Sequence, residues 1–126
     1  MKRILLTLSV SAIAAISFTG NSFADGDVGK GKKVFKKCKA CHTVTDGGKN
    51  LMGPNLFGIV GQKSGQKEDY KYSKAMLAAN LTWDEATLAT YLTKPRALVK
   101  KTKMTFGGLK KEKQRANIIA YLKTLK

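Results

Sequence analysis

Residues 38 to 42 read Cys38-Lys39-Ala40-Cys41-His42. This C-x-x-C-H pattern is typical of covalent haem c attachment. Two thiols three positions apart at the end of a helix can both reach the vinyl groups along one edge of a porphyrin, and the next residue then places an imidazole under the iron. We therefore predict one haem c, bound through Cys38 and Cys41, with His42 as a ligand of the iron.

Three other interpretations of the two cysteines are open. A thioredoxin-like redox pair follows a strand in a βαβ pattern, which this sequence lacks. A structural zinc site needs four ligands, but there is no second cysteine pair and His42 is the only histidine. A disulfide between neighbouring cysteines would close a very small loop and leave the adjacent histidine unexplained. Haem attachment accounts for all three residues.

The first 24 residues have the layout of a secretory signal peptide: a basic start, an apolar run and small residues before Asp25. We predict cleavage after Ala24, one domain over residues 25–126 and a periplasmic location; retention of the segment as a membrane anchor is the alternative. Cleavage leaves 22 basic residues against eight acids, a net charge of +14. Export separates this charge from nucleic acid, so acidic protein partners or anionic membrane surfaces are expected.

The hydrophobic spacing predicts an all-α domain without regular strands. We expect helices over residues 28–39, 73–79 and 110–126, and a further helix that begins at the capping box Thr82-Trp83-Asp84-Glu85 and ends before Pro95. Loops are expected over residues 43–72 and 96–108. The first loop is long for a compact domain, which suggests that it wraps around a buried ligand.

The sixth coordination position of the iron separates a carrier from a catalyst. A methionine is the candidate, because the chain has no second histidine. Met52 follows His42 closely in the chain, so we expect it on the same side of the haem as His42. Met76 lies on a short helix whose other apolar residues suggest core packing. Met104 lies in the polar segment Lys103-Met104-Thr105-Phe106, far enough along the chain to return to the other side of a haem. We predict Met104 as the ligand; a gap-filling thioether is the alternative.

With these residues in place, the chain resembles mitochondrial-type cytochrome c and its bacterial relatives, which are monohaem c-type cytochromes. The resemblance implies the small cytochrome c fold, in which helices and loops surround one covalently bound haem. It covers essentially residues 26–126 and depends on matches in the same order along the chain: Gly31, Phe35, Cys38 to Thr43, Gly53 to Leu56, Tyr70 to Tyr72, Thr82-Trp83, Tyr91-Leu92, Lys94-Pro95, Thr102 to Phe106 and Ala120 to Leu122.

The resemblance also implies roles for residues around the haem. Gly31 and Phe35 would cross the C-terminal helix near Ile118 and Tyr121. The Pro54 carbonyl would accept the His42 Nδ1 hydrogen and so tune the iron. Tyr72 and Trp83 would bind a haem propionate. Tyr91 and Thr102 would lie near the Met104 sulfur, and Phe106 would shield the haem edge. Ordinary core packing is the alternative for Trp83 and Tyr91.

Three positions depart from the family pattern. Gln62 replaces an arginine that usually faces a propionate, and Met76 stands where asparagine is common. Lys100-Lys101 replaces the usual Pro-Gly before the ligand loop, which puts the rigidity of that loop in question.

The resemblance implies an electron carrier and not an enzyme, monomeric, shuttling between a quinol–cytochrome c reductase and a terminal cytochrome oxidase, with cytochrome c peroxidase as another possible partner. Lysines around an exposed haem edge would steer acidic partners to it, although a solvated face explains many lysines individually. A haem peroxidase or ligand sensor is the rival function. The basic residues considered for steering are Lys37, Lys39, Lys63, Lys94, Arg96, Lys100, Lys101, Lys103, Lys110 and Lys111.

Overall fold

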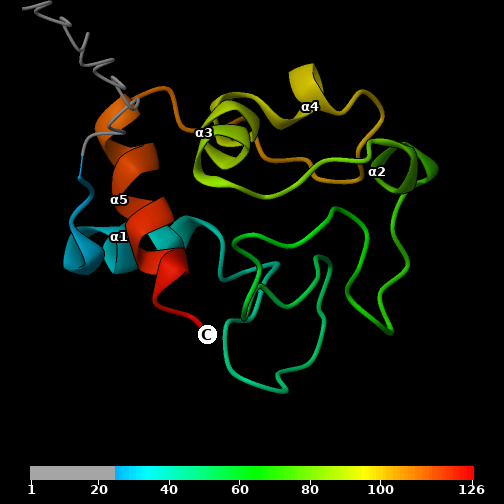
Figure 1. Cartoon of the computed structure of the whole chain (residues 1–126), viewed down its shortest axis with the longest axis horizontal. Coiled ribbons are helices and arrows are strands. Elements are labelled where there is room, and N and C mark those ends of the chain that lie inside the picture. Colours follow the sequence, from blue (N-terminus) through cyan, green and yellow to red (C-terminus); the bar gives the residue numbers. More distant parts are fainter. Residues whose placement is uncertain (1–24) are drawn as a thin grey trace, which may run out of the picture.

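A computed structural model describes residues 25–126, so the predicted signal peptide lies outside the described residues. Within this range the chain forms helices and loops and no strand; only an isolated antiparallel bridge pairs Lys63 with Thr82. The predicted all-α class is confirmed. The elements are α1 (Val28–Val34), the 3-10 helix η1 (Phe35–Lys37), α2 (Lys74–Ala78), α3 (Glu85–Thr93), α4 (Pro95–Leu98) and α5 (Glu112–Lys123), arranged as in Figure 1.

Helices α1 and α5 cross at the left of Figure 1 in close contact. Gly31 lies at the crossing, where a Cβ atom would come within 2.0 Å of the Asn117 carbonyl oxygen. The Asn117 side chain accepts a hydrogen bond of 2.8 Å from the Asp27 N–H, and Asp27 caps α1 by accepting from the Lys30 N–H. Phe35 packs against Tyr121 with ring centroids 5.7 Å apart. The crossing that the resemblance implied is therefore present.

Several predicted helix limits are wrong. The helix expected from residue 82 begins at Glu85, because the Asp84 side chain accepts the Thr87 N–H as the N-cap and Thr82 lies in the bridge. The expected loop from residue 96 begins instead with α4, since Pro95 occupies the first helical turn, where its missing N–H has no cost. The first helix tightens to a 3-10 turn at Phe35, and the last is shorter at both ends than the predicted 110–126.

The long loop over residues 43–72 fills the lower part of Figure 1. It is held by the buried Asn55 amide, whose Nδ2 donates to Thr43 Oγ1 and the Thr45 carbonyl while Oδ1 accepts from the Phe57 N–H. The loop thus has its own polar framework, which frees its apolar side chains to line an interior cavity.

Within residues 25–126, no helix has the length and apolar character needed to span a membrane.

Candidate functional site

All ten predicted site residues line one cavity of about 500 Å³. They come from the segment after η1, the long loop, the segment between α2 and α3, α3 itself and the segment after α4, which meet only in the folded chain. Apolar core residues complete the wall, among them Ile59, Leu88 and Leu122. The predicted residues on the wall are Cys38, Cys41, His42, Pro54, Tyr72, Trp83, Tyr91, Thr102, Met104 and Phe106.

The segment after η1 presents both cysteines and His42 to the cavity. The N–H groups of Cys41 and His42 both donate to the Cys38 carbonyl at 3.0 Å, which closes a tight turn. No disulfide joins the two cysteines, so both sulfur atoms are available for haem attachment. Burial, together with the neighbouring Cys41 and against an opposing effect of Lys37, raises the pKa of Cys38 to about 11. Before haem attachment, this raised pKa favours the neutral thiol of Cys38 over the thiolate at neutral pH.

His42 is oriented by the backbone on one side of its ring. Its Nδ1 donates to the Pro54 carbonyl at 2.7 Å, since a carbonyl can only accept. Burial lowers the pKa of His42, and the hydrogen bond to Pro54 opposes this only in part. Gly53 packs against the imidazole ring of His42, where a Cβ atom would come within 2.3 Å of Cε1. The neutral imidazole thus has Nε2 available as a ligand in a fixed orientation.

The second candidate ligand of the iron, the sulfur of Met104, belongs to a residue that is held by two hydroxyl groups. Tyr91 Oη donates to Met104 Sδ at 3.4 Å and lies 3.4 Å from Thr102 Oγ1. Thr102 Oγ1 also accepts from the Met104 N–H at 3.3 Å. Burial raises the pKa of Tyr91, while the Thr102 hydrogen bond lowers it. The protonated phenol occupies one side of the thioether and leaves another sulfur lone pair for a metal.

Two aromatic residues supply polar groups elsewhere on the wall. Tyr72 Oη accepts the Lys67 N–H at 3.2 Å, and burial raises the Tyr72 pKa. Trp83 packs against Tyr91 with ring centroids 4.9 Å apart, so it serves the core as well as the cavity. Gln62, at the position of the family's arginine, is exposed and is not among the lining residues. The cation that the structure connects to Tyr72 is Lys67, whose Nζ donates to the Phe57 carbonyl.

The other two departures from the family pattern also affect the wall. Met76 is buried and lines the cavity, so it contributes apolar surface where an amide is common. Lys101 has a positive φ of 64°, and the Thr102 N–H donates to the Val99 carbonyl at 3.2 Å. This is the pattern of a type II turn, whose preferred central residues are Pro and Gly. Lys100-Lys101 therefore keeps the turn with a less suitable pair of residues.

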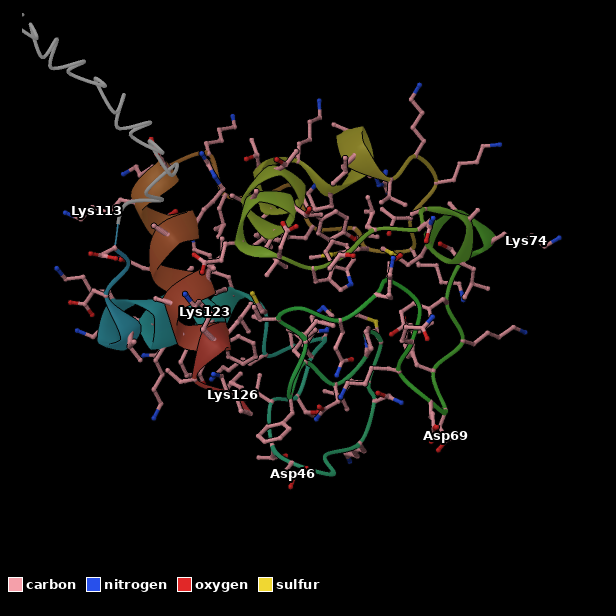
Figure 2. All side chains as sticks on the ribbon, viewed as in Figure 1. Asp46, Asp69, Lys74, Lys113, Lys123 and Lys126 are labelled. Atoms are coloured by element: carbon pink, nitrogen blue, oxygen red, sulfur yellow. The ribbon has the colours of Figure 1, made fainter. Side chains whose placement is uncertain are left out.

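The charges around the cavity have one sign. Lys37 and Lys103 are the charged residues on its wall, and none of the eight acids lines it. Figure 2 shows two of the acids, Asp46 and Asp69, at the outer tips of the long loop. In the part of the chain that the structure describes, the ion pairs are Lys30–Asp27 and Lys123–Glu85, so neither lysine on the wall is paired.

Lys103 also closes the cavity wall between two distant segments. Its Nζ donates to the Lys71 carbonyl at 2.7 Å, 32 residues away along the chain. Sequence reasoning missed this bond and the packing of Gly53 on His42. A glycine directly before Pro54 was a visible signal for the second contact, whereas nothing local indicated the first.

The residues of the cavity fit a haem c. The wall is mainly apolar, two thiols lie one helical turn apart, an imidazole nitrogen and a thioether are free to bind iron, and hydroxyl and indole groups are present for polar substituents. The volume lies in the usual range for cofactor sites. Zinc is a poorer fit, because residues 25–126 contain no cluster of three or more His, Cys, Asp or Glu residues.

Comparison with known proteins agrees with this fit. The family model described as cytochrome c matches residues 28–126. Cytochrome c2 of Rhodospirillum rubrum is 47% identical, over 94% of this chain and 96% of that protein. Cytochrome c-554 of Methylosinus trichosporium is 46% identical, over 94% and 89%. Cytochrome c of the yeast Kluyveromyces lactis is 45% identical, over 79% and 92%.

Proposed function

Because the chain belongs to the cytochrome c family and carries electrons on one covalently bound haem c, we propose that it is a periplasmic carrier whose iron is ligated by His42 and Met104. The observation that carries the proposal is the single cavity shared by both thiols, the free His42 Nε2 and the Met104 sulfur. The bound haem supplies an iron that gains and loses one electron. Thioether ligation raises its reduction potential, which suits a late step of respiration.

The protein residues contribute orientation and exclusion of water. The Pro54 carbonyl and Gly53 fix the His42 ring, and Tyr91 with Thr102 fixes the Met104 side chain. Tyr72 and Trp83, both on the cavity wall, would bind a propionate. Because these groups are set by the fold, they would hold His42 and Met104 in the same positions when the iron changes its oxidation state, as a fast carrier requires.

The partners that we propose are a quinol–cytochrome c reductase as donor and a terminal oxidase as acceptor, with cytochrome c peroxidase as another acceptor. The unpaired Lys37 and Lys103 on the cavity wall support acidic docking surfaces. The relatives named cytochrome c2 come from bacteria, which is consistent with cleavage after Ala24 and release into the periplasm as a monomer.

Steady-state kinetics with purified reductase and oxidase test this function. We expect turnover with both complexes, and a rate that falls as salt rises because attraction between exposed charges is screened. Failure of the reduced protein to donate to any oxidase, or a rate that does not respond to salt, would contradict the proposal. The N-terminal residue of the exported protein, determined by mass spectrometry, tests the cleavage site separately.

The positive φ of Lys101 favours a second candidate function, a peroxidase with a labile sixth ligand. Strain in the turn before Met104 would favour release of the sulfur and open the iron to peroxide. Strong peroxide turnover, together with a weak sulfur–iron absorption band at neutral pH, would support this candidate over the carrier.

A further inference from the structure

Met52 is an unusual residue on the cavity wall because it is 75% exposed, the most of any large apolar residue among residues 25–126. The other exposed large apolar residues lie off this wall: Val28, Leu51, Leu77 and Leu98. A single exposed apolar side chain is ordinary on a protein surface. Its position at the cofactor and the rigidity of its backbone make Met52 different.

The backbone around Met52 is fixed on both sides. The Gly53 N–H donates to the Cys41 carbonyl at 2.8 Å, and the Leu51 N–H donates to the Gly53 carbonyl at 2.9 Å. Tyr70 Oη donates to the Met52 carbonyl itself at 2.6 Å. The Met52 backbone is therefore held at a position tied directly to the haem-attachment segment. A partner that buries the side chain need not order the backbone there, which lowers the entropy cost of binding.

The exposed residues of the cavity wall define its rim: Lys37, Met52, Lys103 and Thr105. The rim combines one apolar side chain with two unpaired cations and no acid. Interfaces commonly place an apolar contact at the centre of a polar margin. Methionine suits such a contact because its thioether is flexible and polarizable and adapts to more than one partner surface.

We propose that Met52 is the apolar anchor through which redox partners dock at the rim. The fitting partner is a protein face with a small apolar depression bordered by Asp and Glu, which would pair with Lys37 and Lys103. This inference rests on the proposed carrier function and adds a contact that is not electrostatic. It predicts that part of the affinity for the partner persists at high salt.

The test compares the haem-loaded wild type with three variants in oxidase kinetics at low and high salt. Met52→Gln keeps the length of the side chain and removes its apolar character, whereas Met52→Leu keeps both size and apolarity. Leu77→Gln is the matched control, because Leu77 is 58% exposed on α2 and does not line the cavity. Visible spectra of all four proteins report whether the haem site is unchanged.

We expect Met52→Gln to raise KM about tenfold, as for loss of a buried anchor, by a similar factor at both salt concentrations and with an unchanged spectrum. Met52→Leu and Leu77→Gln should stay close to the wild type. Equal KM values for Met52→Gln and Leu77→Gln would overturn the proposal, as would a changed spectrum in Met52→Gln. Absence of turnover in the wild type would overturn the proposed function, and this inference with it.

Discussion

Lys101 occupies a backbone conformation that glycine adopts more readily. Its φ is 64°, and it is the third residue of the turn closed by the Thr102 N–H on the Val99 carbonyl. For an L-residue with a side chain, the left-handed region raises the conformational energy by roughly 1–2 kcal/mol. Glycine avoids that energy, but it lowers the stability by about 0.5–1 kcal/mol because it loses more backbone entropy on folding. Lys101→Gly should therefore stabilise the protein by about 0.5–1 kcal/mol.

Lys100→Gly is the matched control for this variant. It removes the same charge from the same turn, but Lys100 has no positive φ. Only the entropy term remains, so Lys100→Gly should destabilise the protein by about 0.5–1 kcal/mol. The opposite signs separate backbone strain from relief of repulsion between lysines.

Thermal and denaturant unfolding of the haem-loaded proteins measure both effects. For a domain of this size, the Lys101→Gly gain corresponds to a rise in melting temperature of about 2–8 °C. Hydrogen exchange of the Thr102 and Met104 amides should slow as well, because local opening of the turn becomes rarer. Equal shifts of the same sign in both variants would refute the strain argument.

Three further predictions concern the glycines of α1, a buried core residue and the N-cap of α3. Gly31→Ala would place its Cβ against the Asn117 carbonyl and should cost at least about 2 kcal/mol of stability, whereas Gly29→Ala, with its nearest contact at 3.4 Å, should be neutral or stabilising in the same unfolding assay. Leu109 is 2% exposed, so Leu109→Ala should cost about 2–5 kcal/mol in denaturant unfolding; a loss below half of this would show that the site collapses around the cavity. The Asp84 pKa is lowered from 3.8, first by the backbone hydrogen bond at the start of α3, so its stabilisation is complete above the unfolded value and is lost as pH falls through the depressed folded value. Melting curves from pH 2 to 7 should therefore show the difference between wild type and Asp84→Asn shrinking in acid, and a difference that is constant with pH would contradict this assignment.

The sequence alone predicted the all-α class and the residues of the cavity, because these depend on residue types at fixed spacing. The C-x-x-C-H segment and the one polar-loop methionine located both candidate ligands without any distance. The resemblance also placed Gly31 correctly at a close helix contact, where only a residue without a side chain fits.

The errors arose where competing local signals had similar strength. Both Thr82 and Asp84 are good N-caps, and the bridge from Lys63 to Thr82 decided between them. Pro95 was read as the end of one helix, although it also begins α4. The bond from Lys103 to Lys71 and the exposure of Met52 depend on packing between segments far apart in the chain, so no local pattern indicated them.

The sulfur–iron absorption band of the oxidised protein tests the central claim most directly. Three methionines line the cavity, Met52, Met76 and Met104, so each is a conceivable ligand. We predict that the band is present in the wild type and in Met76→Leu and Met52→Leu, and that it is absent in Met104→Leu. A band that survives in Met104→Leu, or that disappears in Met76→Leu, would contradict the account.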